Sequence, residues 1–176
     1  MRSEDFVLKV KELKPNESLL LTYSSEFVNE TLKQFDIKKR DTVVEYGNEL
    51  LDLLRGYDIS NLVIGGIQFK EEVLEDEFYF YLGNDEADVI VLNKESGKVL
   101  ILDHEDMTRV LCECAKDGSS YLDAIVEAKK FFLSCAFDEE FSCEQEDKCS
   151  MAFKCASLAG GKEYMTYFKG LLGCWS

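Results

Sequence analysis

The sequence predicts an α+β fold in which a central antiparallel meander sheet is packed by helices before and after it. The sheet signal lies in residues 78–106, where three apolar runs of strand length are separated by turn-forming residues. Apolar residues at helical spacing lie on both sides of this stretch. Because the predicted helices flank the strands and do not alternate with them, the pattern indicates α+β and not a parallel βαβ sheet.

The three strands of the meander are expected at residues 78–82, 87–92 and 98–102. The two breaks, 83–86 and 93–97, contain Gly and Asn, which can take the positive φ angles of tight turns. Breaks of four and five residues suit hairpins. Both faces of the sheet are largely apolar through the middle, so we expect helices to pack on at least one of them.

Three helices are predicted before the sheet, each from apolar residues at helical spacing and a polar residue that can cap the first turn. The third is the clearest, because Thr42 and Glu45 form a capping-box pattern and Gly56 stands where a C-terminal glycine belongs. The three are expected at residues 3–14, from Ser24 or Ser25 to Phe35, and at residues 42–56.

Two short strands, 62–64 and 67–69, are expected after the third helix, with a bend or bulge at Gly65-Gly66. This glycine pair lacks the helix and lysine of a phosphate-binding loop. An acidic link, residues 71–77, then leads into the meander. After the meander, residues 107–115 have β character.

A further helix is expected from Ser120, which forms a capping-box pattern with Asp123, to about residue 133. Residues 134–176 are predicted to be helical and divided at Gly160-Gly161. We expect a domain formed by residues 1–133, with 134–176 as a helical extension packed on it. The buried face of the helix to residue 133 would carry Tyr121, Ile125, Ala128 and Phe132.

The chain has 35 acidic and 20 basic residues, which give a formal net charge of −15. Nucleic acids and anionic membranes bind proteins largely through Lys and Arg, so we expect neither as a partner. A basic protein partner fits this charge, because opposite fields accelerate encounter. Acidity also has a simpler reading, in which it only keeps a protein soluble.

The first 14 residues alternate charged and apolar side chains and lack the continuous apolar core of a signal peptide. No run approaches the roughly 20 apolar residues that span a bilayer. The seven cysteines cannot all pair within one chain. We therefore expect reduced thiols and a cytoplasmic protein.

The order of elements and the wording of the meander resemble the SUKH superfamily, many of whose bacterial members are immunity proteins that neutralise secreted polymorphic toxins. The resemblance covers roughly residues 24–133. It rests on the third helix, residues 61–69, the segment YLGNDEADVIVLNKESGKVLILDHED and the hydrophobic helix near 121–133. It implies a non-catalytic cytoplasmic binder whose sheet face and neighbouring loops engage a toxin domain.

Asp103-His104-Glu105-Asp106 is the most site-like cluster, with the only histidine of the chain among three carboxylates. A hydrolase could use such a histidine as a general base, or a metal could be held there. Catalysis needs further partners, and many nucleases also need a basic surface. A solvated turn or a partner-contacting loop are the other readings of this cluster.

Cys112 and Cys114 lie in a predicted strand, where period two places both thiols on one face. The spacing of the other cysteines matches no four-ligand zinc site. On a helix, six-residue steps would point Cys143, Cys149 and Cys155 in three directions. We expect small buried hydrophobes, and neither a metal nor another cofactor.

The acidic runs are read either as solvated faces or as a negative rim that pairs with a basic toxin domain. We expect an immunity-type binding protein and not an enzyme. The alternatives are a metal-dependent hydrolase centred on Asp103, His104 and Asp106, and a regulatory scaffold with the same fold. The expected partner-binding residues are Glu71, Glu72, Glu75, Asp76, Glu77, Asp85, Glu86, Asp88, His104 and Glu105.

Overall fold

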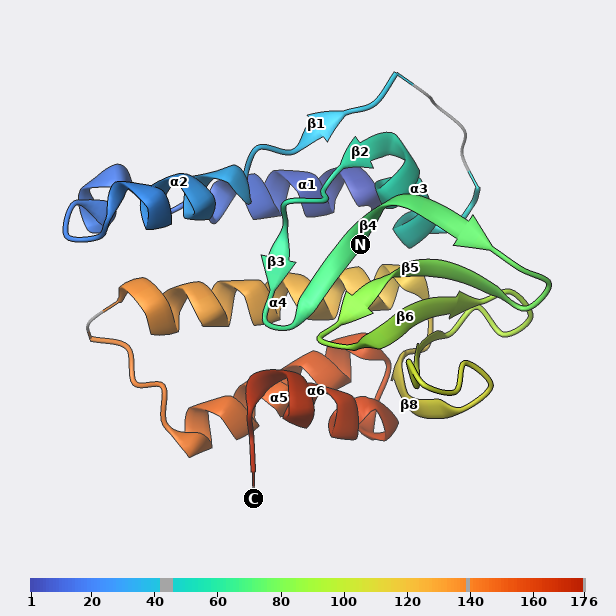
Figure 1. Cartoon of the computed structure of the whole chain (residues 1–176). Helices are drawn as coiled ribbons and strands as arrows, with labels where there is room; N and C mark the ends of the chain where they lie inside the picture. The colour runs from blue at the N-terminus through green and yellow to red at the C-terminus, as the bar shows by residue number, and fades with distance from the viewer. Residues whose placement is uncertain (42–45, 139, 176) are drawn as a thin grey trace.

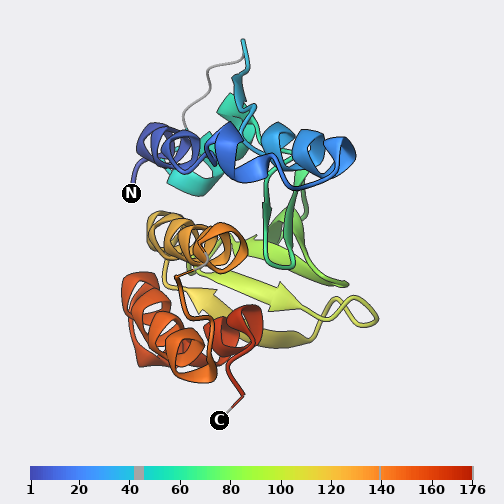
Figure 2. The ribbon, with the colours of Figure 1, turned by 90° about the vertical axis from the view of Figure 1, so that its left-hand side faces the viewer.

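The structure is a computed structural model that describes residues 1–41, 46–138 and 140–175 (Figure 1). Its six-stranded sheet is an antiparallel meander, because every strand pairs with its neighbour in sequence. Helices precede and follow the sheet, and they lie on one side of it (Figure 2). The predicted α+β class is confirmed.

The sheet has the order β3-β4-β5-β6-β7-β8, and two residue pairs form a separate ribbon, β1-β2. The strands are β1 (Lys38–Lys39), β2 (Tyr57–Asp58), β3 (Val63–Ile64), β4 (Ile67–Glu75), β5 (Tyr79–Asp85), β6 (Asp88–Asn93), β7 (Val99–Leu102) and β8 (Val110–Ala115). The helices are α1 (Ser3–Glu12), η1 (Glu17–Leu20), α2 (Ser25–Lys33), α3 (Glu49–Gly56), α4 (Gly118–Phe137), α5 (Gln145–Ala159), η2 (Lys162–Tyr164) and α6 (Met165–Leu172).

Helix α4 is the centre of the helical layer, with α1 and α3 on one side of it and α5 on the other (Figures 1 and 2). Its predicted core residues Tyr121, Ile125 and Ala128 are fully buried, whereas Phe132 is half-buried. The same core includes Cys155 of α5 and Phe168 of α6. The helices after residue 134 thus pack on the layer formed by the earlier ones.

The predicted capping box of α4 is wrong, because the helix begins two residues earlier. The Asp117 side chain caps it by accepting a hydrogen bond from the Ser120 backbone N–H at 2.7 Å. Asp123 has another partner, since its carboxylate is 2.6 Å from the N-terminal amino group of Met1. Asp123, which the local pattern assigned to the cap, forms this long-range ion pair instead.

The buried lysine of α4, Lys129, connects this helix to the end of α2 and to the edge strand β3. Its Nζ donates to the Val63 carbonyl at 2.8 Å and to the Gln34 side chain. The residue is only 5% exposed, and its burial lowers the pKa of the amine to about 8.

The third predicted helix is shorter than expected. Thr42 and Glu45 lie outside the described residues, and Gly47 has φ +70°, which a helix cannot contain. Helix α3 begins at Glu49, where the Asn48 side chain accepts a hydrogen bond from the Leu50 N–H at 3.1 Å. The helix ends at Gly56, as predicted.

The acidic link predicted at residues 71–77 is largely a strand. β4 continues to Glu75, with a bulge between Phe69 and Leu74, after which Leu74 pairs with Tyr81. The sequence did not predict this strand because most of its residues after Phe69 are exposed and many are acidic, whereas the prediction relied on apolar runs.

The first hairpin turn of the meander also lies elsewhere than predicted. Gly83 is inside β5 and does not turn the chain; a Cβ there would lie 2.3 Å from the Gln68 carbonyl oxygen. It allows close approach of β4 at a bulge. The turn is formed by Glu86 and Ala87, and Glu86 takes φ +54°.

Helices cover one face of the sheet, as expected, and the other face carries a smaller apolar cluster. It consists of Val89, Val91, Leu100 and Leu102, with Tyr79 and Tyr81 packed against them. Both faces of the central strands are therefore apolar because one packs in the main core and the other carries this smaller cluster.

The cysteine prediction is wrong for four of the seven residues. Cys135 is bonded to Cys143, and Cys149 to Cys174, with Cα–Cα distances of 5.5 Å and 5.1 Å. Cys112, Cys114 and Cys155 are free thiols. Because disulfides are typical of oxidising environments, these bonds do not favour the predicted cytoplasmic location. Within the described residues, no helix is long and apolar enough to cross a membrane.

Candidate functional site

The β5–β6 hairpin places three of the predicted binding residues together. Asp85 and Asp88 are paired across its end, and Glu86 stands in the turn between them. The Glu86 N–H donates to the Gly66 carbonyl at 3.0 Å, which joins this turn to the one between β3 and β4. The local strand pairing therefore gathers three carboxylates at one end of the sheet.

A pocket of about 360 Å³ lies beside this hairpin, and we call it the hairpin pocket. Residues far apart in the sequence line it, from the two hairpin turns, β7, β8, α6 and the C-terminal segment. The lining residues are Gly66, Asp85, Glu86, Asp88, Ile101, Leu111, Cys112, Thr166, Tyr167, Gly170, Leu171 and Trp175.

Asp85 is the half-buried carboxylate of the pocket. Burial raises its pKa, and a hydrogen bond from the Tyr167 hydroxyl lowers it in part. The hydroxyls of Tyr167 and Tyr121 are 3.1 Å apart, so the carboxylate is connected to the core. No basic side chain is among the described residues that line the pocket.

Gly66 is needed for this arrangement. A Cβ at Gly66 would lie 2.3 Å from Oδ1 of Asp85 and 2.8 Å from Cγ of Glu86. Gly65, at φ +60°, makes the bend that the sequence predicted between β3 and β4. The glycine pair thus positions the acidic hairpin.

His104 lies next to the hairpin, in the turn after β7. Its Nδ1 is 2.8 Å from Oδ1 of Asp88, and this hydrogen bond raises the pKa of His104 and lowers that of Asp88. Glu105 is exposed beside it. The predicted residues Asp85, Glu86, Asp88, His104 and Glu105 therefore lie at the same end of the sheet.

The predicted hydrolase cluster is not assembled as proposed. Asp106 turns away to accept hydrogen bonds from the N–H and hydroxyl of Thr108, at 3.1 Å and 2.6 Å. Possible metal-ligand atoms of Asp88, Asp103 and His104 instead lie within 4.8 Å of one another. Asp103 is already paired with Arg109, whose Nη1 is 3.3 Å from its carboxylate.

Glu75, Asp76 and Glu77 lie at the opposite end of β5, whereas Glu71 and Glu72 lie in the bulge of β4 that faces the middle of this strand. This strand has seven residues, so its ends are about 20 Å apart. Asp76 stabilises the β4–β5 turn by accepting from the N–H groups of Phe78 and Tyr79, both at 2.8 Å. Glu75 is paired with Lys94 at 2.7 Å. The remaining members of this group, which are exposed, are Glu71, Glu72 and Glu77.

The two free cysteines of β8 share a face of the strand, as predicted. A hydrogen bond from Cys114 lowers the pKa of Cys112, which is half-buried and lines the hairpin pocket. Cys114 is fully buried beneath it. The pair is consistent with the predicted packing role.

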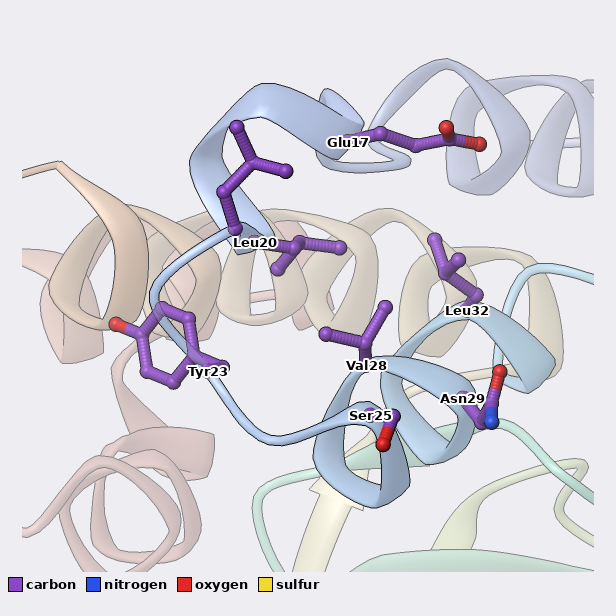
Figure 3. Close-up of a pocket in the computed structure, with 8 residues that line it drawn as sticks. Glu17, Leu20, Tyr23, Ser25, Val28, Asn29 and Leu32 are labelled. Carbon is purple, nitrogen blue, oxygen red and sulfur yellow. The ribbon is translucent and has the colours of Figure 1, made fainter.

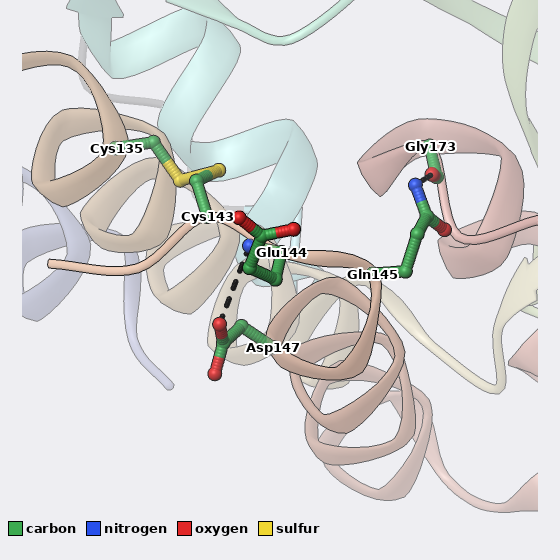
Figure 4. The surroundings of a disulfide bond; sticks show 6 residues. All are labelled: Cys135, Cys143, Glu144, Gln145, Asp147 and Gly173. Carbon is green, nitrogen blue, oxygen red and sulfur yellow. Dashed lines mark hydrogen bonds between the residues drawn. A yellow bond between two sulfur atoms is a disulfide. The ribbon is translucent and has the colours of Figure 1, made fainter.

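Sequence reasoning missed the contribution of α6 and the C-terminal segment to the pocket. Trp175 is 77% exposed, an unusual position for the only tryptophan of the chain. Its backbone N–H donates to the Gln145 side chain at 3.1 Å. Figure 4 shows Gln145 beside Gly173, to whose carbonyl the Gln145 Nε2 donates at 3.3 Å. The one signal available was a single tryptophan near the end of the helical extension predicted at residues 134–176.

Two further depressions lie around the N-terminal helices. One, of about 420 Å³, lies between η1 and α2 (Figure 3) and is lined mainly by aliphatic side chains such as Leu20, Val28 and Leu32. The other, of about 930 Å³, lies between residues 12–23 and the end of α4. Neither gathers the residues that the sequence singled out.

Comparison with known proteins finds no family model, no curated protein and no solved structure that matches this chain. The fold and the hairpin pocket therefore define the protein at the level of class only: an acidic α+β protein with a carboxylate-lined pocket. The resemblance to the SUKH superfamily stays a prediction.

Proposed function

We propose that this protein is a non-catalytic, immunity-type binding protein that neutralises a basic toxin domain by direct contact. One observation carries the proposal: five of the predicted binding residues converge on the hairpin pocket or next to it, at one end of the sheet. The net charge of −15 also favours a positively charged partner. Toxin domains that cut nucleic acid need basic clefts, and an acidic surface can cover such a cleft.

The contacts of the charged groups support binding more than catalysis. Asp106 is bonded to Thr108 and Asp103 is paired with Arg109, so both carboxylates predicted to assist His104 in a hydrolase are engaged by other groups. Glu86 and Glu105 are exposed, and neither side chain forms a hydrogen bond or an ion pair of this kind with another of the described residues. They are the side chains best placed to meet a partner.

The test begins with capture of the partner from lysate of the source organism on the tagged full-length chain, at low and high salt. The captured basic protein should arrest growth when expressed alone and should not do so when expressed with this chain. Growth arrest that persists despite co-expression would overturn the proposal.

Two charge-reversal variants then locate the surface. Glu86→Lys with Glu105→Lys alters the end of the sheet that holds the pocket. Glu71→Lys with Glu77→Lys is the matched control, at two exposed positions outside the pocket lining. We expect the first variant to slow association at least about tenfold at low salt and to weaken its salt dependence. Equal effects of the two variants would assign binding to net charge alone.

The metal-dependent hydrolase is the second candidate, because Asp88, Asp103 and His104 offer ligand atoms within 4.8 Å of one another. Oxygen and imidazole ligands of this kind suit Zn²⁺ or Mn²⁺. Calorimetric titration with each ion, for the wild type and for His104→Ala, tests it: tight binding that the variant loses would favour this candidate. A regulatory scaffold differs from the immunity protein only in its partner, which the capture experiment identifies.

A further inference from the structure

The hairpin pocket has the lining of a receptor for one cationic side chain. Its three carboxylates come from a single hairpin, and two of them differ from ordinary surface groups. Asp85 is half-buried, and Asp88 is held in place by His104 at 2.8 Å. A cation that reaches Asp85 meets a carboxylate already partly stripped of water, where attraction is stronger than at an open surface.

The apolar part of the lining suits the stem of a long basic side chain. Ile101, Leu111 and Leu171 line the pocket together with the carboxylates. Lys and Arg bury their methylene groups along such surfaces while the charged head reaches a polar partner. The volume of about 360 Å³ is at the lower end for ligand pockets, which suits one side chain better than a large molecule.

Trp175 favours a guanidinium over an ammonium. Its indole is 77% exposed and lines the same pocket as Asp85. Arg stacks on aromatic faces, binds carboxylates in a bidentate manner and is less strongly hydrated than Lys. Trp and Arg are also the residues that most often dominate the energy of protein interfaces.

We propose that the hairpin pocket receives one arginine side chain of the protein partner, with its guanidinium between Asp85, Glu86 and the Trp175 indole. The inference rests on the proposed function, because that function supplies a basic protein partner. It adds the chemistry of the central contact. The exposed tryptophan is then the surface that the arginine covers.

The probe is the blocked tripeptide acetyl-Gly-Arg-Gly-amide, titrated into the full-length protein. Trp175 is the only tryptophan, so its indole N–H resonance in a ¹H–¹⁵N spectrum reports on the pocket without ambiguity. We expect saturable binding with millimolar affinity, as for other single-side-chain ligands. The isosteric citrulline peptide should cause no saturable shift. The lysine peptide should bind at least about threefold more weakly than the arginine peptide.

Two variants test the carboxylates. Asp85→Asn keeps the hydrogen bond with Tyr167 and should weaken the arginine peptide about tenfold; Glu86→Gln, at an exposed position that cannot affect the core, should weaken it about threefold. Glu77→Gln at the other end of the sheet should change nothing. Equal binding of the citrulline peptide, tighter binding of the lysine peptide or an unchanged affinity in both variants would overturn the inference.

The two proposals can fail separately. If a partner is captured and its affinity does not change in Asp85→Asn, the arginine pocket is wrong and the immunity function stands. If the arginine peptide binds as described and the captured partner is not toxic, the pocket stands and the immunity function is wrong.

Discussion

Replacing Cys149 and Cys174 with alanine should destabilise the protein and loosen the segment that carries Trp175. This disulfide joins the first turns of α5 to the segment after α6, across a sequence separation of 25. A cross-link that closes a loop of that length lowers the entropy of the unfolded chain by an amount worth about 3.5 kcal/mol at 25 °C. We expect a loss of unfolding free energy of about 3 kcal/mol.

The second consequence concerns the pocket. Cys174 directly precedes Trp175, and the Trp175 N–H is the donor to Gln145 at the start of α5. Without the disulfide, this short segment keeps that hydrogen bond, the one to Gly173 and the one from the Cys174 N–H to the Lys169 carbonyl at 2.9 Å, but loses its covalent link to α5. We therefore expect lower fluorescence anisotropy for Trp175 and weaker binding of the arginine peptide.

The assay is urea unfolding without reductant, followed by far-ultraviolet circular dichroism. The control variant replaces Cys135 and Cys143 with alanine, removing a disulfide whose loop spans only 8 residues (Figure 4). It should lose about 2.5 kcal/mol by the same entropy argument and leave Trp175 unchanged.

A thiol count gives the refuting result directly. Unfolded protein that was never reduced should expose three reactive thiols, those of Cys112, Cys114 and Cys155, and reduction should raise the number to seven. Seven reactive thiols before reduction, or an unfolding free energy that the alanine variant leaves within about 0.5 kcal/mol of the wild type, would refute the reasoning.

Three further predictions concern charge and packing. His104 should titrate above the usual histidine pKa because Asp88 binds its charged form, and Asp88→Asn should return it toward normal; the single histidine makes the NMR titration unambiguous, and no difference would contradict the pairing. The pKa of Lys129 is about 8 in the folded protein against 10.5 ordinarily, so between these pH values the unfolded chain binds more protons and stability rises with pH. In urea unfolding, the wild type should therefore gain about 2 kcal/mol of unfolding free energy relative to Lys129→Met from pH 7 to pH 9.5. The same pH dependence in both proteins would disprove it. Gly83→Ala should cost about 2 kcal/mol because its Cβ would meet β4 backbone, whereas Gly56→Ala, with open space, should change stability by less than about 0.5 kcal/mol; equal melting temperatures would rule out the close approach.

Local patterns were sufficient where one element decides its own structure. The apolar runs of strand length in residues 78–102, separated by turn-forming residues, predicted the three central strands. Ser24, one of the two predicted caps, caps α2, with its hydroxyl accepting from the Phe27 N–H. Patterns failed where a distant group intervened. Asp123 pairs with the N-terminal amine and not with the predicted cap, and Gly83 allows close approach of the β4 backbone and does not form a turn.

The same distinction applies to the candidate site. The sequence identified Asp85, Glu86 and Asp88, because acidic residues at a hairpin are visible in the chain. It did not separate them from Glu75 and Asp76, since the distance between two hairpin ends depends on strand length and pairing.

By itself the sequence determined the α+β class, the meander and the strongly acidic character, because periodicity, turn chemistry and charge are properties of neighbouring residues. Only the tertiary structure decided the two disulfides and the hairpin pocket. Tyr167 bonds to Asp85, and Trp175 lines the same pocket, because α6 packs against β8 and the C-terminal segment is bonded to α5. Such contacts join residues about ninety positions apart, and their geometry is set by packing of whole helices on a sheet, which no local pattern records.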